Sequence, residues 1–359
     1  MRLSVVELAT VTPGANKTHA LEAAVASARQ ADDLGFHRFW YAEHHGIAGQ
    51  ASHAPELLIG IAARETSRIR VGSGAVLLNH HSPFKVTETF LQLEALAPGR
   101  IDLGLGRATT GPLIDLALRR DRNSPDVDDF GEQVQEVLAY LHHDFPEDHP
   151  FAGIDLTAGI PTRPEVWILG SSGSSARLAG ELGLGYTFAG FINPTGAERA
   201  LLRHRAAFTP TRFGPSAHRS ILAVHVVVAD TDAEAKRLSW SVRAQYARLA
   251  HAGTAAMTPS VAEAERELSR AEKDAPTVIV DGRWPRFLAG SPDTVREHLE
   301  HMAAVTGAGE LMVQDVIPDP DDRAKSRALL ARALGVTPRR PATAARDRAR
   351  DRVADHLQE

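Results

Sequence analysis

Short apolar runs separated by longer amphipathic stretches repeat along the chain, a pattern typical of buried parallel strands followed by covering helices. Eight runs predict strands, at 3–8, 38–42, 69–74, 101–105, 165–169, 186–189, 221–229 and 311–315. Helix-like stretches lie between them at 18–34, 55–66, 84–96, 174–182 and 233–249. Gly35, Gly99 and Gly183 stand where the C-terminal glycines of helices usually stand. This alternation suits a closed (β/α)8 barrel, but a doubly wound open sheet gives the same local pattern, so both remain open.

Two longer segments interrupt the alternation, at 108–130 after the fourth strand and at 251–288 after the seventh. In a barrel both would lie over the C-terminal mouth, where extra residues often form lids; for the first, a solvated surface loop is an equally good interpretation. Residues 336–359 begin with prolines and continue as a mixture of Ala, Arg and Asp. This composition predicts a linker or marginal helix outside a single domain that spans 1–335.

Composition narrows the classes of partner. A chain of 359 residues that is 43% hydrophobic can build one large core, and a net charge of -5 provides no basic field for nucleic acid. The absence of cysteine excludes disulfides, thiolate metal sites and a cysteine nucleophile. The N-terminus lacks the pattern of a signal peptide, and no apolar run approaches the roughly 20 residues that span a bilayer. We therefore expect a cytoplasmic enzyme with a small-molecule substrate and no membrane partner.

Three ionisable residues, Glu43, His44 and His45, directly follow the second predicted strand. In a barrel this position is the catalytic mouth. Histidine can take or give a proton near neutral pH, and a neighbouring carboxylate can fix its tautomer, so the group is equipped for acid–base chemistry. The alternative is one histidine that faces the core and one that faces solvent.

A metal site is a third interpretation, because further imidazoles are present at His53, His80 and His81. Adjacent residues of an extended chain point in opposite directions, so His44 and His45 cannot easily bind one ion. The spacing also fits no standard zinc motif, and we predict no metal.

Three further strand ends carry small or polar residues. After the third strand, small side chains would admit a flat ligand or mark a bulge; these are Gly72, Ser73, Gly74 and Ala75. Arg107 follows the fourth strand and could hold a phosphate or form a surface ion pair. After the fifth strand comes a turn into a helix, whose first N–H groups attract phosphate although serine is also an ordinary helix cap; its residues are Gly170, Ser171, Ser172 and Ser175. All these features fall at the same end of successive strands, which favours one ligand site.

Together these segments resemble the bacterial-luciferase-like monooxygenases, specifically their alkanal-monooxygenase-like, FMN-dependent branch. The resemblance covers about residues 2–335 and is carried by 42–45, 71–76, 98–107 and 170–179. It implies a (β/α)8 TIM barrel with lid insertions after strand 4 and strand 7.

The resemblance also implies roles for individual residues. His44 is similar to the family's catalytic histidine, with Glu43 as its neighbour. The residues that would back the isoalloxazine ring, where relatives often have a non-prolyl cis peptide, are Gly72, Ser73, Gly74 and Ala75. Those that would meet the FMN phosphate are Arg107, Gly170, Ser171, Ser172 and Ser175. Light-emitting luciferases have a Glu-Ser pair where this chain has Ser171-Ser172, so light emission from a long-chain aldehyde is not expected.

The implied activity is that of a flavin-dependent monooxygenase. Reduced FMN from a separate flavin reductase, together with O2, would oxygenate an aldehyde, a ketone or an aromatic or natural-product intermediate. Two alternatives remain open: a deazaflavin-dependent oxidoreductase on the same barrel, and a non-catalytic flavin-binding protein. A homodimer is expected only by analogy with relatives.

Overall fold

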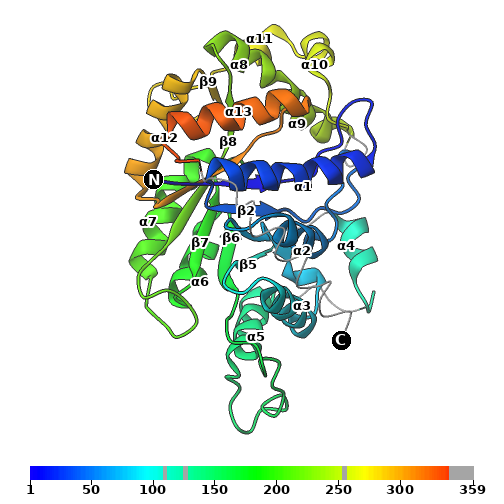
Figure 1. Ribbon diagram of the computed structural model, residues 1–359, viewed down its shortest axis with the longest axis vertical. Helices are drawn as coiled ribbons and strands as arrows, with labels where there is room; N and C mark the ends of the chain where they lie inside the picture. Colours follow the sequence, from blue (N-terminus) through cyan, green and yellow to red (C-terminus); the bar gives the residue numbers. More distant parts are fainter. Residues whose placement is uncertain (108–110, 124–127, 253–256, 339–359) are drawn as a thin grey trace, which may run out of the picture.

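A closed ring of parallel strands forms the centre of the computed structural model, which describes residues 1–107, 111–123, 128–252 and 257–338 (Figure 1). The ring strands, in order, are β1 (Arg2–Glu7), β2 (Arg38–Tyr41), β3 (Arg70–Ser73), β5 (Ile101–Gly106), β6 (Glu165–Gly170), β7 (Gly185–Ala189), β8 (Ser220–Val228) and β10 (Glu310–Gln314). β10 pairs with both β8 and β1, which closes the ring. The eight predicted strands are confirmed, and closure decides for the (β/α)8 barrel over the open sheet.

Two short strands were not predicted. β4 (Val76–Leu77) follows a turn after β3 and pairs with β5. β9 (Phe287–Gly290) pairs in parallel with the last part of β8. Strands of two and four residues are too short to show a hydrophobic period, and β9 also lies at the end of the segment that we assigned to the second insertion.

Helices cover the outside of the ring (Figure 1). They are α1 (Lys17–Leu34), α2 (Pro55–Glu65), α3 (Pro83–Leu96), α5 (Phe130–His142), α6 (Gly173–Glu181), α7 (Ala197–Ala207), α12 (Pro292–Thr306) and α13 (Pro320–Ala333), with the 3-10 turns η1 (Leu78–His80) and η2 (Pro194–Gly196). Gly35, Gly99 and Gly183 adopt positive φ angles of 90°, 74° and 68°, as their predicted position after helices requires. Within the described residues, no helix has the length and apolar character to cross a membrane.

The predicted helix at 233–249 is two helices, α8 (Asp232–Leu238) and α9 (Trp240–Ala252). They separate at Ser239, whose hydroxyl donates to the carbonyl of Lys236. A serine hydroxyl that bonds to nearby backbone competes with the regular helical pattern, and this is a feature that hydrophobic periodicity does not register.

Both predicted insertions contain short helices. The first holds α4 (Pro112–Leu118), and the second holds α10 (Val261–Glu267) and α11 (Arg270–Asp274). α4 lies against the end of the second strand unit, because a Cβ on Gly46 would be 2.8 Å from Ile114 Cδ1 and His80 Nε2 is 3.4 Å from Asp115 Oδ1. A lid function stays a prediction for both segments. Residues 108–110, 124–127, 253–256 and most of the predicted tail, 339–359, lie outside the described residues.

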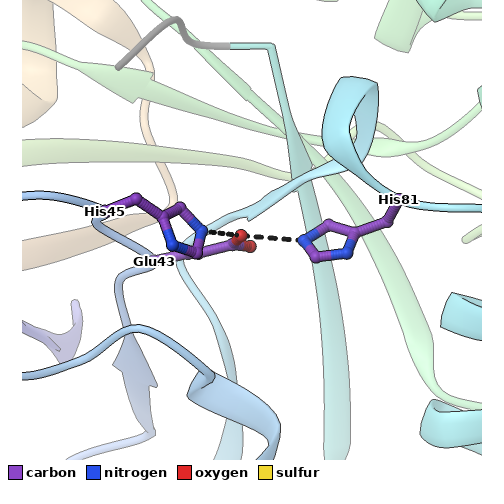
Figure 2. Close-up of side chains that lie close together, drawn as sticks. All are labelled: Glu43, His45 and His81. Atoms are coloured by element: carbon purple, nitrogen blue, oxygen red, sulfur yellow. Dashed lines mark hydrogen bonds and ion pairs between the residues drawn. The ribbon is translucent and has the colours of Figure 1, made fainter. Parts of the chain in front are cut away.

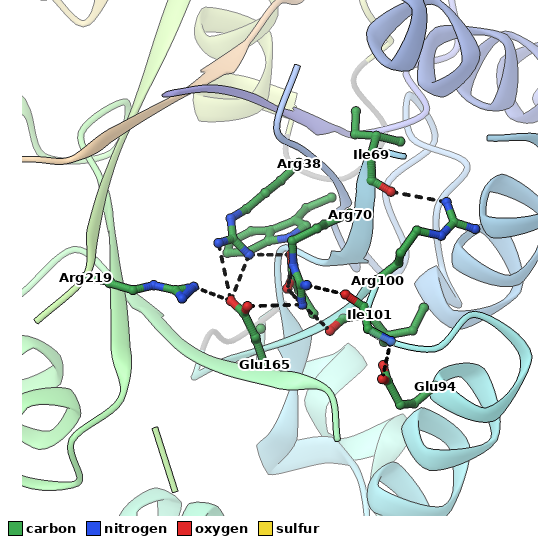
Figure 3. Close-up of polar contacts among 12 residues, drawn as sticks. Arg38, Ile69, Arg70, Glu94, Arg100, Ile101, Glu165 and Arg219 are labelled. Carbon is green, nitrogen blue, oxygen red and sulfur yellow. Dashed lines mark hydrogen bonds and ion pairs between the residues drawn. The ribbon is translucent and has the colours of Figure 1, made fainter. Parts of the chain in front are cut away.

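The N-terminal end of the barrel is filled by paired charges (Figure 3). Arg38 is fully buried and bonds to Asp102 at 2.7 Å, Glu310 at 3.1 Å and Glu165 at 3.3 Å. Each of these carboxylates stands at or next to the start of its strand. Above them the interior continues with apolar side chains, among which Trp40 and Trp167 pack edge to face at 5.8 Å. This end of the barrel is therefore closed, and a ligand must enter from the other end.

Candidate functional site

The four segments singled out in the sequence lie side by side on the C-terminal rim of the barrel. They follow β2, β3, β5 and β6, which are consecutive neighbours in the ring. The strand ends are also in register, since Tyr41 pairs with Ser73, Leu77 with Gly106, and Gly106 with Leu169. The structure thus brings the predicted site residues to one edge of the molecule.

His44 presents a ring nitrogen that has no partner among the described residues. Its backbone N–H donates to the carbonyl of Ser52 at 2.9 Å, which fixes the chain, while its Nδ1 is buried without a hydrogen bond from the described residues. Burial lowers the pKa of His44 to about 4, although the nearby Glu43 charge acts in the opposite direction. The imidazole is therefore neutral near pH 7, with one ring nitrogen able to exchange a hydrogen bond or proton with a bound molecule.

Glu43 contacts two other histidines rather than the His44 ring (Figure 2). Its Oε1 accepts hydrogen bonds from His45 Nε2 at 2.6 Å and His81 Nε2 at 2.8 Å. Burial would raise the pKa of Glu43, but the hydrogen bonds from His81 and His45 outweigh it and hold that pKa below its usual value. The same contact raises the pKa of His81. The carboxylate thus bonds to the His45 and His81 rings and not to the His44 ring, because neighbouring side chains leave an extended strand end on opposite sides.

These three residues are also the group that could hold a metal ion, since their ligand atoms lie within 4.8 Å of one another. The separations of 2.6 and 2.8 Å are hydrogen-bond lengths. Two ligands at about 2.0–2.1 Å from a tetrahedral zinc ion would stand about 3.3 Å apart. The arrangement is thus that of a hydrogen-bonded carboxylate, and Glu43, His45 and His81 form what we call the Glu43 cluster.

The turn between β3 and β4 contains a cis peptide between Gly74 and Ala75, as the resemblance led us to expect. Gly74 faces the barrel interior, where a Cβ would lie 3.1 Å from Trp40 Cβ. Gly72 has a packing reason instead, because a Cβ there would lie 2.6 Å from Asp102 Cβ on the next strand. The Ser73 hydroxyl bonds to both the N–H and the carbonyl of Gly104 at 2.9 Å. The Ala75 methyl lies against Gly106 of β5, so the side of the turn that can face a flat ligand is mainly backbone.

Arg107 stands immediately after β5 with an exposed side chain, and it bonds to Asp128 from the first insertion. The surface ion pair that we kept as an alternative is thus present. An exposed pair of this kind is easily exchanged for another anion.

The turn from β6 into α6 leaves helix N–H groups open. Ser172 is the N-cap residue, but its side chain makes no capping bond and instead contacts the hydroxyls of Ser174 at 2.9 Å and Ser175 at 3.3 Å. Gly170 is needed because a Cβ there would lie 2.7 Å from Ser175 Cβ. Open N–H groups and hydroxyls at a helix start form an anion-binding site.

Three residues that support this turn were not found from the sequence. The Tyr186 hydroxyl lies 3.0 Å from both the Ser172 carbonyl and Ser175 Oγ, and Asn193 Nδ2 donates to the Ser171 carbonyl at 3.1 Å. Arg203 of α7 places Nη1 3.2 Å from where a Cβ on Gly173 would be, and it has no ion-pair partner within the described residues. These residues come from the next β–α unit, so only the packing of α6 on α7 reveals them.

A second polar group faces the same end from β8. His225 is fully buried, pairs in register with the last residue of β10, Gln314, and lies 3.1 Å from the Tyr246 hydroxyl. Burial lowers the pKa of His225 to about 3. The side-chain oxygen of Gln314 is buried without a partner in the described part of the chain. A histidine in a run of otherwise apolar residues, 221–228, is the signal that could have pointed to it.

Comparisons with known proteins agree with this geometry. The family model for luciferase-like monooxygenases matches residues 1–309. The N-acetyl-S-alkylcysteine monooxygenase of Bacillus subtilis is 32% identical over 335 residues, which cover 93% of this chain and 98% of that protein. The crystal structure of apo-MsnO8 is 43% identical, with a TM-score of 0.84 and coverage of 94% of this chain and 99% of that one.

The same fold occurs in the oxygenating constituent of 3,6-diketocamphane monooxygenase from Pseudomonas putida, which was solved in complex with FMN. It is 24% identical, with a TM-score of 0.68 and coverage of 95% and 99%. The matched family model spans most of the barrel, including all four strand ends described above. The chain belongs to the luciferase-like monooxygenase family.

Proposed function

We propose that the chain is a flavin-dependent monooxygenase that uses reduced FMN, delivered by a separate flavin reductase, and O2 to oxygenate a small organic substrate. The substrate classes that we retain are aldehydes, ketones and aromatic or natural-product intermediates. One observation carries the proposal: an imidazole with an unpartnered buried nitrogen and a serine-lined helix start lie on the same rim.

The residues at the rim fit a phosphorylated flavin. The open N–H groups at the start of α6, with Ser171, Ser172 and Ser175, would hold the phosphate, and the guanidinium groups of Arg107 and Arg203 would flank it. The 72–75 backbone, with Gly74 over Trp40, would back the ring. The 3,6-diketocamphane monooxygenase constituent solved with FMN is 24% identical to this chain, whereas the F420-dependent secondary alcohol dehydrogenase of the same fold is 16% identical, which favours FMN over a deazaflavin.

The chemistry that a bound reduced flavin would contribute is its reaction with O2, and the protein's own groups would control protons and water. His44 would hold or move a proton at Nδ1, because that atom is buried and has no protein partner among the described residues. The apolar interior below Gly74 would keep water away from the ring. Glu43 contributes to the same site through the contacts described above.

Cofactor titration tests this proposal. Wild-type protein is titrated without oxygen with reduced FMN, reduced riboflavin and a reduced deazaflavin, and oxygen is then admitted with a panel of candidate substrates. We expect FMN to bind more tightly than the other two and oxygen to be consumed with product formation. Tighter binding of the deazaflavin, or binding without any oxygen consumption, would favour one of the two alternatives.

A homodimer is proposed on the α1–α2 face. α2 exposes Leu57 and Ile61, with exposed fractions of 68% and 50%, at the wall of an apolar hollow of about 600 Å³ that Leu21, Val25 and Leu58 also line. A projecting leucine next to a hollow is self-complementary under a two-fold axis. Light scattering should therefore give a dimer for the wild type and a monomer for Leu57→Glu.

A further inference from the structure

The Glu43 carboxylate accepts hydrogen bonds from three segments of the rim, and Figure 2 shows the two bonds from histidines. His45 and His81 donate to Oε1, and the backbone N–H of Leu77 donates to Oε2 at 2.9 Å. The side chain of Glu43 is only 1% exposed. Its donors belong to the end of the β2 unit, to β4 and to the residue after η1.

These bonds lie where the backbone ladder has ended. β2 and β3 pair up to Tyr41 and Ser73, and one further bond joins the Gly74 N–H to the Tyr41 carbonyl. Beyond that point the partners diverge: β4 pairs with β5, and the His44 N–H bonds to Ser52. Glu43 therefore reconnects two rim segments that strand pairing no longer holds together.

The two segments that Glu43 connects are those to which we assign proton transfer and contact with the flavin ring. One carries His44, which is adjacent to Glu43 in the chain, and the other is the 74–77 backbone that would back the flavin ring. We infer that Glu43 and His81 are positioning residues that set the distance between the His44 imidazole and the flavin-backing turn. This inference rests on the proposed function but goes beyond it, because it assigns Glu43 a task other than proton transfer.

The hydrogen-bond chemistry explains why a carboxylate is required. All three groups that face Glu43 are donors, and an ionised carboxylate offers only acceptors. A glutamine whose NH2 group faces the Leu77 N–H would release that segment. One whose NH2 group faces the imidazoles would keep them only if both rings change to the tautomer with a bare Nε2, and the charge that strengthens all three bonds would be lost. The lowered pKa of Glu43 keeps the carboxylate ionised through the neutral range.

Neither oxygen of Glu43 is placed to act on the reacting atoms. Both accept bonds from fixed groups, and the unpartnered nitrogen at the rim belongs to His44. The variants Glu43→Gln and His81→Leu should therefore alter the geometry of the rim while the phosphate turn of α6 stays intact.

Hydrogen–deuterium exchange of the cofactor-free protein gives the first test. In Glu43→Gln and His81→Leu, peptides that cover 42–46 and 74–81 should exchange faster than in the wild type, while peptides from the β6–α6 turn should not change. Glu88→Gln and His19→Ala, at exposed positions away from the rim, are the matched controls. Unchanged exchange of the 42–46 and 74–81 peptides in both Glu43→Gln and His81→Leu would overturn the inference.

Reaction of bound reduced FMN with oxygen gives the second test. We expect both variants to bind reduced FMN within about threefold of the wild type but to release hydrogen peroxide at least about tenfold faster, since a misplacement of about 1 Å can change rates by about a hundredfold. His81→Gln keeps a donor for Glu43 and should recover part of the wild-type behaviour. Peroxide release at the wild-type rate in both variants, or a loss of FMN affinity as large as the gain in peroxide release, would also overturn the inference.

A failure of the proposed function would look different. A wild-type protein that binds no reduced FMN would refute the flavin assignment, whereas the exchange experiment would still decide whether the carboxylate holds the two rim segments together.

Discussion

Removal of the Arg203 guanidinium tests the phosphate site most directly. Arg203 Nη1 lies 3.2 Å from the Cβ position of Gly173, the first residue of α6, so its charge is next to the helix start. A cation at this end of a helix is unfavourable unless an anion lies between them. A phosphate at the turn would stand roughly 5 Å from the guanidinium, where two unit charges attract by about 1 kcal/mol in water and about 3 kcal/mol at an effective dielectric constant of about 20.

Because Arg203 is exposed, the lower part of that range applies, about 1–2 kcal/mol. Arg203→Ala should thus weaken FMN binding by about 5- to 30-fold. The assay is fluorescence titration with FMN and with riboflavin, at low and high salt. Arg205→Ala on the same helix removes the same charge, from a side chain that lies near Gly307 instead, and serves as the control.

The result that supports the reasoning is specific to the phosphate. Arg203→Ala should leave riboflavin binding unchanged, and its effect on FMN should shrink as salt screens the charge. Equal losses for FMN and riboflavin, or an equal loss in Arg205→Ala, would refute a phosphate at the α6 turn.

Three further predictions concern the rim of the barrel. His44→Ala should keep FMN affinity but divert oxygen toward peroxide, and an unchanged product yield per oxygen would count against a proton role for His44. Asp128→Asn should tighten FMN binding several-fold but not riboflavin binding, because it frees Arg107 from a competing anion; isothermal calorimetry measures both. Burial lowers the pKa of His44 to about 4 and of His225 to about 3. Between these values and the unfolded value of about 6.5, the unfolded chain binds more protons than the folded one. The free energy of unfolding should therefore decrease as the pH is lowered, by up to about 1.4 kcal/mol per pH unit for each histidine. Urea unfolding between pH 7.5 and about 4.5 should show this loss, and His225→Gln should reduce its slope; an unchanged slope would exclude a contribution from His225.

The barrel could be predicted because its strands are buried on both sides. Such strands appear as short apolar runs, and runs such as 221–229 are unmistakable when polar helices flank them. The sequence pattern alone could not predict that the sheet is closed. Closure depends on the pairing of β10 with β1 and β8, and pairing between distant strands produces no local sequence pattern. The resemblance supplied that step.

The site was predictable as a set of strand ends but not as a set of contacts. The residues after β2, β3, β5 and β6 were identified because parallel strands bring their ends together. The partners were not: Glu43 bonds to His81, 38 positions away, and Arg203 reaches Gly173 from the next helix. Glycines were also hard to interpret, since Gly72 and Gly170 make room for Asp102 and Ser175 rather than for a ligand.

The ionisable groups at the two ends of the barrel differ, and this difference argues for a ligand at the rim, although Trp167 Nε1 beside the Arg38 network also has no partner among the described residues. At the floor every carboxylate of the Arg38 network has a guanidinium partner, which buried charges require. At the rim, His44 Nδ1 and Gln314 Oε1 are buried without partners in the described chain. An unpaired buried polar atom costs about 1–3 kcal/mol, a cost that a bound molecule can remove. A ligand bound at the rim would therefore stabilise the fold, and reduced FMN should raise the melting temperature of the wild type more than that of Arg203→Ala, in which FMN binding is weakened.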